Sequence, residues 1–337
     1  MSCLHFTKII AFFIFPFFAW MHNFIQAEES ATKFHHVQEK PIVVIIPSYN
    51  TEKWCHSTLK STFAQKYNNY RVIFIDDSSQ DLTLDQALSF LYSRKIPCTV
   101  IHFDDAGLSI EEASDLFAKQ VANNQDQKCL VIHNKNRCGA LENIYRAIYS
   151  CANEKAIIVL LDGDDQLYGK FVFKDVNAIY SLTNVWLTHG SCTSNYSELP
   201  RASFPIPRKY IKKNTFRKFW LPSHLQTFYV ALFKKIQLED LLMPESFFDA
   251  YATLPMNIQA KEYSTKRMFL PVAWDVGIMY PMIEMAGKHH YFFSKINYIY
   301  NNANDLNDHK LYPQLQLQLA NYLRKKHPYK KLSSLFS

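Results

Sequence analysis

Glycine is scarce in this sequence, with seven in 337 residues. The segment PSYNTEKW, which follows the first expected strand, contains none. A sugar nucleotidyltransferase on a comparable α/β sheet would need a glycine-rich, basic triphosphate loop at this point, so that enzyme class is disfavoured. Hydrophobic residues make up 48% of the chain and charged residues 20%. This composition excludes a disordered, collagen-like or low-complexity chain.

Paired cysteine motifs and a strong charge bias are also missing. The seven cysteines include no CxxC pair, which argues against a zinc site, and several lie in or beside apolar runs. We therefore expect buried free thiols rather than a disulfide framework. The net charge of +7 is too diffuse to indicate a nucleic-acid partner, although it is consistent with anionic ligands or a membrane surface.

Long hydrophobic runs are limited to the N-terminus. Lys8 precedes the apolar run IIAFFIFPFFAW, and Ala27 ends the segment at a small residue. Residues 1–27 are expected to be a signal peptide cleaved after Ala27 or, if the run extends to Ile25, an N-terminal anchor. Either case predicts an exported or membrane-anchored protein, with activity on the cytoplasmic face left open. The absence of further spans argues against a processive polysaccharide synthase.

The rest of the chain alternates between strand and helix patterns. Buried β-branched runs predict strands over 41–47, 71–75, 98–103, 129–133 and 156–161, and helical spacing predicts helices over 51–67, 84–93, 109–122 and 141–152. This alternation predicts an α/β fold with a mostly parallel, doubly wound sheet. Residues 186–312 are richer in aromatics and proline and are expected to form a second half of the same domain, followed by a helical basic tail over 313–337.

Polar clusters follow three of the expected strands. They are Pro47 to Asn50, Asp76 to Ser79 and Asp162 to Asp165. Ligands of such sheets bind at the carboxyl ends of the strands, so the clusters should face one site. Carboxylates packed together repel unless a cation neutralises them, which points to Mg²⁺ or Mn²⁺ and to a ligand that carries a diphosphate.

Four segments, VVIIPSYN, VIFIDDSSQD, NRCGALENIYRAI and VLLDGDDQL, resemble the successive motifs of family 2 glycosyltransferases. The resemblance covers residues 41–170 and implies the GT-A (Rossmann-like, nucleotide-diphospho-sugar transferase) fold, with residues 41–185 as the nucleotide-sugar-binding half. It also implies a metal-dependent reaction with Mn²⁺ or Mg²⁺ and a nucleoside-diphosphate sugar, with a UDP-sugar favoured. The residues implied to bind the donor nucleotide are Pro47, Tyr49, Asn50, Asp76, Asp77, Gly139 and Asp162, with Asp164 on the metal.

The third segment departs from the family pattern, because Glu142 stands where the family carries an arginine. Arg137 and Arg146 are the alternative sources of a phosphate-facing charge. This departure also supports the alternative of a catalytically silent sugar- or nucleotide-binding module of the same fold.

The acceptor side is expected within 186–312. By resemblance, Asp275 in a Trp-Asp pair before a helix is the candidate catalytic base; the alternative role is a helix N-cap. Glu284 is the second candidate for the base, His309 resembles a late metal ligand, and His224 and Trp274 are weaker candidates for acceptor or phosphate contact. The expected reaction is an inverting transfer of a hexose to a hydroxyl of a glycan, lipid or protein, with retention as the less favoured outcome.

Overall fold

The computed structural model describes residues 38–194, 197–201, 203–218, 222–252 and 268–336. Residues 40–337 belong to one compact unit. The strands are β1 Ile42–Ser48, β2 Tyr70–Asp76, β3 Cys98–Phe103, β4 Cys129–Asn134, β5 Ile157–Leu160, β6 Gln166–Leu167, β7 Leu187–Ser194, β8 Ser197–Arg201, β9 Ser223–Tyr229 and β10 His290–Tyr300.

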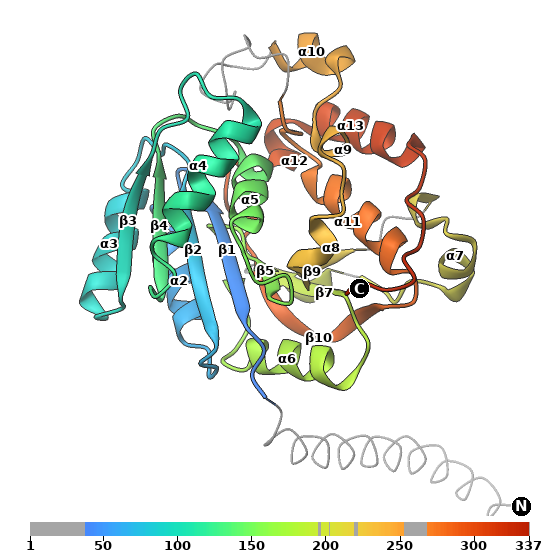
Figure 1. Ribbon diagram of the computed structural model, residues 1–337, viewed down its shortest axis with the longest axis horizontal. Helices are drawn as coiled ribbons and strands as arrows, with labels where there is room; N and C mark the ends of the chain where they lie inside the picture. The colour runs from blue at the N-terminus through green and yellow to red at the C-terminus, as the bar shows by residue number, and fades with distance from the viewer. Residues whose placement is uncertain (1–37, 195–196, 202, 219–221, 253–267, 337) are drawn as a thin grey trace, which may run out of the picture. The chain divides into compact units, whose positions relative to one another are not determined.

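Helices connect and cover these strands. The α-helices are α2 Cys55–Phe63, α3 Thr83–Ser93, α4 Ile110–Ala122, α5 Ala140–Tyr149, α6 Val172–Leu182, α7 Arg208–Lys213, α8 Val230–Phe233, α9 Leu238–Leu241, α10 Phe248–Ala252, α11 Trp274–Ala286, α12 Asp308–Leu311 and α13 Pro313–Lys325. Short 3₁₀ turns lie at η2 Phe216–Lys218 and η3 Glu245–Phe247. Figure 1 shows α4 and α5 in front of the strands β1, β2 and β4.

The strands form one ten-stranded sheet in the order β3-β4-β2-β1-β5-β9-β7-β10-β6, with β8 paired to β7. The first five strands in this order are parallel, whereas β9 runs antiparallel to both β5 and β7. The expected α/β fold with a mostly parallel sheet is therefore confirmed. The continuous apolar strands β1 and β2 are buried on both faces because helices cover the sheet.

Local signals in the first half lead to the observed elements. Ser109 caps α4 by accepting a hydrogen bond from the Glu112 backbone N–H, and the Glu112 carboxylate accepts one from the Ser109 N–H. This capping box satisfies backbone donors that the first helical turn leaves open. The helix therefore begins where the sequence places it.

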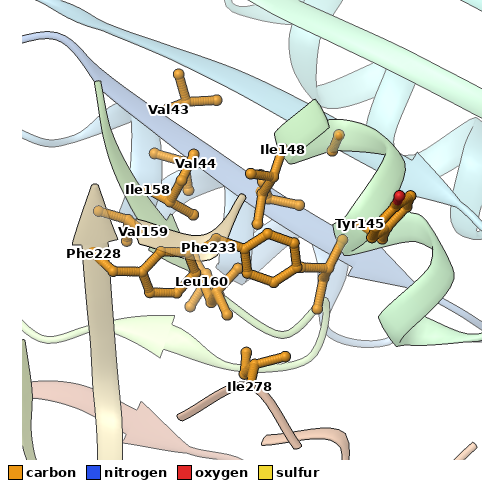
Figure 2. Packing of buried hydrophobic residues seen from close by; sticks show 14 of the residues in the cluster. Val43, Val44, Tyr145, Ile148, Ile158, Val159, Leu160, Phe228, Phe233 and Ile278 are labelled. Atoms are coloured by element: carbon orange, nitrogen blue, oxygen red, sulfur yellow. The ribbon is translucent and has the colours of Figure 1, made fainter. Parts of the chain in front are cut away.

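Strand β5 joins the two halves of the chain, since it pairs with β1 on one side and β9 on the other. Figure 2 shows the core around this junction, where side chains of β1 and β5 pack with those of β9 and of helices α5, α8 and α11. The labelled residues are Val43, Val44, Tyr145, Ile148, Ile158, Val159, Leu160, Phe228, Phe233 and Ile278. The loop that follows β5 is therefore supported from both halves.

The cysteines of the described residues form no disulfide. Cys55, Cys129, Cys138, Cys151 and Cys192 are buried free thiols, and Cys98 is half-buried. Burial raises the pKa of the Cys55 thiol to about 12, so this side chain is an inert, neutral group of the core. The expectation of buried free thiols is confirmed.

The prediction of an exported or membrane-anchored protein is contradicted. Within the described ranges, no helix is long and apolar enough to cross a membrane. The longest helices there have 13 residues, a length of about 20 Å, against about 30 Å of hydrocarbon in a bilayer. The predicted signal peptide or anchor, residues 1–27, lies outside the described residues.

Candidate functional site

A cavity of about 420 Å³ opens at the carboxyl ends of the parallel strands. Its walls come from the ends of β1 and β2, the loop before α5, the loop after β5, the start of α11 and the segment from Tyr300 to Gln316. The site residues predicted from the sequence line this cavity, except Asp76 and the second candidate for the base, Glu284. Residues far apart in the chain therefore meet where the α/β topology predicts a ligand site.

The loop after β1 is fixed to the loop after β2. The Asn50 N–H donates to Ser79 Oγ at 2.9 Å, and Asn50 Oδ1 accepts from the Gln80 N–H at 2.8 Å. Asn50 adopts a φ of 51°, an uncommon conformation for a residue other than glycine. Such conformations persist where surrounding bonds impose them and are concentrated at functional sites. Pro47, Tyr49 and Asn50 are thereby held at the cavity wall.

The two aspartates that end β2 have different positions. The Asp77 carboxylate lines the cavity and accepts 2.8 Å bonds from the backbone N–H groups of Cys138 and Gly139 and from Asn134 Nδ2. Asp76 is fully buried behind it, 2.7 Å from His133 Nδ1, and burial raises the pKa of Asp76. Asp76 does not line the cavity, and its predicted role in nucleotide binding remains a prediction.

The departure at Glu142 has a structural explanation. Glu142 is buried and accepts a hydrogen bond from Arg146 one helical turn later, and Arg146 also bonds Asp105 at 2.8 Å. Neither Glu142 nor Arg146 lines the cavity. Both residues belong to α5 and are buried in the core, so Glu142 does not present a carboxylate to the cavity.

Arg137, in contrast, lines the cavity. Its guanidinium carbon lies 3.7 Å from the centroid of the Tyr49 ring, in cation–π contact. Gly139 follows with a φ of 88°, a conformation that glycine adopts without strain, and lies directly before α5. The third motif therefore presents an arginine and an open backbone turn to the cavity.

The loop after β5 fits tightly against the end of β1. A Cβ atom at Gly163 would lie 2.1 Å from Ser48 Oγ and 2.9 Å from the Pro47 carbonyl oxygen, so only glycine fits. The Gly163 N–H donates to that carbonyl at 3.0 Å, and Thr58 Oγ1 donates to the Gly163 carbonyl. Gly163 thus sets the position of the two aspartates beside it.

Two asparagines after β10 hold the same loop from the other half of the chain. Asn304 Nδ2 donates to Asp164 Oδ2 at 2.7 Å, and the Asn301 N–H donates to Asp165 Oδ1 at 2.6 Å. Asp162 and Asp164 line the cavity, whereas Asp165 is buried in the loop. The segment after β10 therefore positions the acidic motif.

Four carboxylates, which we call the acidic cluster, face the cavity: Asp162, Asp164, Asp275 and Asp308. Burial, followed by repulsion from Asp164, Asp308 and Asp275, raises the pKa of Asp162 to about 8. Burial also raises the pKa of Asp308 to about 7 and that of Asp275 to about 6. Carboxylate oxygens that repel one another fit a hard divalent cation, because such a cation offsets their repulsion.

Within the described residues, metal-ligand spacing is found outside the cavity, where the ligand atoms of Asp105, Cys138 and Glu142 all lie within 4.8 Å of one another. The Arg146 guanidinium bonds all three of these side chains and supplies the positive charge among them. This buried group is therefore an ion-pair network rather than a fit for a metal.

Asp275 lies in the first turn of α11, and its Oδ1 accepts the Val276 N–H at 2.8 Å. The N-cap position belongs to Ala273, which has a φ of 54°, so the proposed alternative of an N-cap aspartate does not hold. Glu284, the second candidate for the base, lies outside the cavity wall and is fully buried. It makes two bonds to Arg217, of 2.6 and 2.8 Å, and is a structural residue.

The remaining candidates, His224, His309 and Trp274, are aromatic residues that line the cavity. The His224 ring stacks on Tyr298 at 4.6 Å and on Tyr300 at 6.0 Å between centroids. His309 Nδ1 lies 3.4 Å from the Tyr300 hydroxyl and its side chain is exposed. Trp274 is half-buried beside Asp275 and lines the same cavity. The predicted roles of His224, Trp274 and His309 remain predictions.

Sequence reasoning missed Asn304, Asp308 and Tyr312 as cavity residues. The available signal was the run NNANDLND after the last expected strand, because such a run of polar residues is typical of a loop with many hydrogen bonds. Leu315 and Gln316 also reach the cavity from α13, so the tail expected over 313–337 contributes to the site.

Comparison with solved structures gives distant likenesses. The residue 1–349 structure of Staphylococcus aureus TarS with UDP-GlcNAc has 17% identity, a TM-score of 0.46, and coverage of 78% of this chain and 59% of that one. A Pyrobaculum calidifontis mannosyltransferase with GDP-Man and Mn²⁺ has 12% identity, 90% and 73% coverage, and a TM-score of 0.44. Mycobacterium tuberculosis glucosyl-3-phosphoglycerate synthase with Mn²⁺, UDP and glucosyl-3-phosphoglycerate has 14% identity, 88% and 89% coverage, and a TM-score of 0.46.

Sequence comparison is more specific. No curated protein matches this chain. The family model described as glycosyl transferase family 2 matches residues 43–111, which span β1, β2, β3 and the Asn50 and Asp77 loops. The resemblance drawn from the motifs is thereby confirmed over residues 43–111, which form the strands β1, β2 and β3 in the parallel part of the sheet.

Proposed function

We propose that this chain is a metal-dependent, inverting glycosyltransferase that moves a hexose from a nucleoside-diphosphate sugar, with UDP favoured, to an acceptor hydroxyl. The supporting observation is that the three strand-end motifs and Asp275 line one cavity. We assign residues 41–185 to donor binding and residues 186–312, with the start of α13, to acceptor binding. A glycan, a lipid and a protein remain open as acceptors.

Each part of the cavity has a chemical task in this proposal. Tyr49, Asn50 and Asp77 lie where the nucleoside would bind, and Asp162 and Asp164 would hold Mn²⁺ or Mg²⁺ through carboxylate oxygens. When bound, the ion would supply positive charge to the departing diphosphate. Asp275 would accept the proton of the acceptor hydroxyl as that oxygen attacks the anomeric carbon. One base and one displacement give inversion.

The structure weakens the alternative of a silent binding module. Its main support was Glu142, and that side chain is bonded to Arg146 outside the cavity. The elevated pKa of Asp275, about 6, also suits a group that accepts a proton near neutral pH. A sugar nucleotidyltransferase remains disfavoured, because the loop after β1 has no glycine.

Isothermal titration calorimetry tests this proposal. UDP and GDP are titrated into the chain with and without Mn²⁺, beside Asp164→Asn and the control Asp126→Asn, an exposed aspartate outside the cavity. We expect Mn²⁺-dependent binding of one nucleotide that Asp164→Asn loses and Asp126→Asn keeps. Absence of binding to either nucleotide would overturn the donor assignment.

A further inference from the structure

The cavity has an unusual charge balance. The described residues that line it include the acidic cluster and Asp77. Arg137 is the one arginine or lysine among these lining residues. Arg146, the other cation considered for the third motif, is 1% exposed and engaged by Asp105 and Glu142. Among the described lining residues, Arg137 is thus the one permanently charged cation available to a ligand that carries a diphosphate.

Arg137 has a defined position in the cavity wall. Its guanidinium carbon lies over the Tyr49 ring, 3.7 Å from the ring centroid. A guanidinium group carries several N–H donors in one plane, a geometry that suits phosphate oxygens. The contact with Tyr49 therefore restrains a group with the donors that a diphosphate needs at the cavity wall.

Arg137 is near both the Tyr49 ring and the acidic cluster. It contacts Tyr49, which the proposal assigns to the nucleoside, and its positive charge partly opposes the burial and the repulsion from Asp275 that raise the pKa of Asp308. A group within electrostatic range of both lies where the diphosphate of a nucleotide would connect its nucleoside to its sugar. Planar guanidinium groups bind phosphate oxygens with two parallel bonds.

We propose that Arg137, stacked on Tyr49, binds the diphosphate of the donor and stabilises its negative charge as it departs. This charge takes the place of the arginine that the family carries at the position of Glu142. The inference depends on the proposed function and adds a residue to it. A fixed cation at a departing diphosphate stabilises the transition state, because charge accumulates there as the glycosidic bond breaks.

The test compares nucleotides with nucleosides in Arg137→Met, Arg137→Lys and the wild-type chain. The control is Lys135→Met, which removes an exposed positive charge two residues away, outside the cavity. Affinities for UDP, GDP, uridine and guanosine are measured by calorimetry with Mn²⁺. We expect Arg137→Met to weaken binding of the nucleoside diphosphate about 10- to 100-fold and to leave nucleoside binding unchanged.

The other variants separate charge from shape. Arg137→Lys should recover part of the lost affinity, since it keeps the charge but not the planar fork, and Lys135→Met should bind like the wild type. Equal losses for diphosphate and nucleoside would place Arg137 on the nucleoside and overturn the inference, as would unchanged binding in Arg137→Met. If the wild-type chain binds neither UDP nor GDP, the proposed function itself fails.

Discussion

Gly163 has no room for a side chain, because the end of strand β1 lies directly against it. The sequence identified it only as the middle of an acidic motif. We expect Gly163→Ala to lower the free energy of unfolding by about 1–3 kcal/mol, because the added Cβ forces Ser48 and the Pro47 carbonyl apart. It should also weaken nucleotide binding, measured by calorimetry, since Asp162 and Asp164 move with the loop.

Gly169→Ala is the matched control for this substitution. A Cβ there meets nothing within 4 Å, but the φ of 92° is unfavourable for alanine, at a cost of about 1 kcal/mol. Thermal unfolding should show destabilisation in both variants. Normal nucleotide binding in Gly163→Ala would show that the close approach to Ser48 does not position the acidic motif.

Asp275 is the residue on which the proposed chemistry depends. Asp275→Asn should lower kcat by about 10²–10⁴-fold, because an amide does not accept the proton, and should leave nucleotide affinity nearly unchanged. Since burial raises the pKa of the carboxyl group to about 6, the wild-type rate should rise with pH through that region as the base loses its proton. Transfer assays across pH, with Asp126→Asn as control, measure both effects.

The types and spacing of residues in the sequence predicted which residues belong to the site, but not which contacts they make. Asp77 was expected to contact a nucleoside, and the structure adds three bonds to residues 57–62 positions later. Arg146 was a candidate for the ligand and is a core residue instead. Whether a side chain faces the cavity or the core depends on the direction in which one turn of α5 points, and a local sequence pattern does not determine that direction.

Among the elements, α11 illustrates how a polar group is accommodated in a buried helix. Glu284 is fully buried in this helix, bonds Arg217 of η2 and also accepts the Tyr329 N–H at 2.9 Å. Arg217 in turn donates to the Leu323 carbonyl of α13. One ion pair therefore connects η2, α11, α13 and the segment that follows.

Glu284→Gln should lower the free energy of unfolding by about 3–5 kcal/mol, because the buried Arg217 loses its counter-charge. The exposed pair of Lys295 and Asp175 provides the control: Lys295→Met should cost less than about 1 kcal/mol. Denaturant unfolding followed by circular dichroism measures both. A small loss in Glu284→Gln would mean that solvent reaches Arg217.

Strand β7 contains a buried histidine that makes stability depend on pH. Burial lowers the pKa of His189 to about 3, whereas an unfolded histidine titrates near 6.5. Between these values the unfolded chain binds a proton that the folded chain does not, so stability falls as the pH falls, by up to about 1.4 kcal/mol per pH unit. His189→Gln should reduce this slope in unfolding curves measured from pH 7 to pH 4; an unchanged slope would contradict it.

The elements from β1 to β5 were predictable to within a few residues, since continuous β-branched runs and amphipathic helices are local signals, whereas β6 and α6 were not expected. The strand expected over 98–103 is β3, and the helix expected over 109–122 is α4 with Ser109 as its cap. The second half was not predictable in this detail. Its helices α8, α9 and α12 have four residues each, too few for a helical period to be recognised, and β9 pairs with strands far away in sequence.

The whole molecule has one core between residues 40 and 337, because β5 is shared by both halves. Differential scanning calorimetry should therefore show one cooperative transition, with equal calorimetric and van't Hoff enthalpies. Residues 41–185 alone should not fold stably, since β5 would lose β9 and expose Ile158 and Val159. Two separate transitions would show that the halves are independent.

The hydrogen bonds that hold the acidic loop also determine when the site can form during translation. The parallel strands β1 to β5 pair with one another and are made first, and domains begin to fold from the N-terminus during translation. Asp165 and Asp164, however, find their partners Asn301 and Asn304 only 136 and 140 residues later. A ribosome that pauses after β9 but before Asn301 would carry β5 between its two partner strands with an immature site, so nucleotide binding should be acquired only after the segment that follows β10 is made.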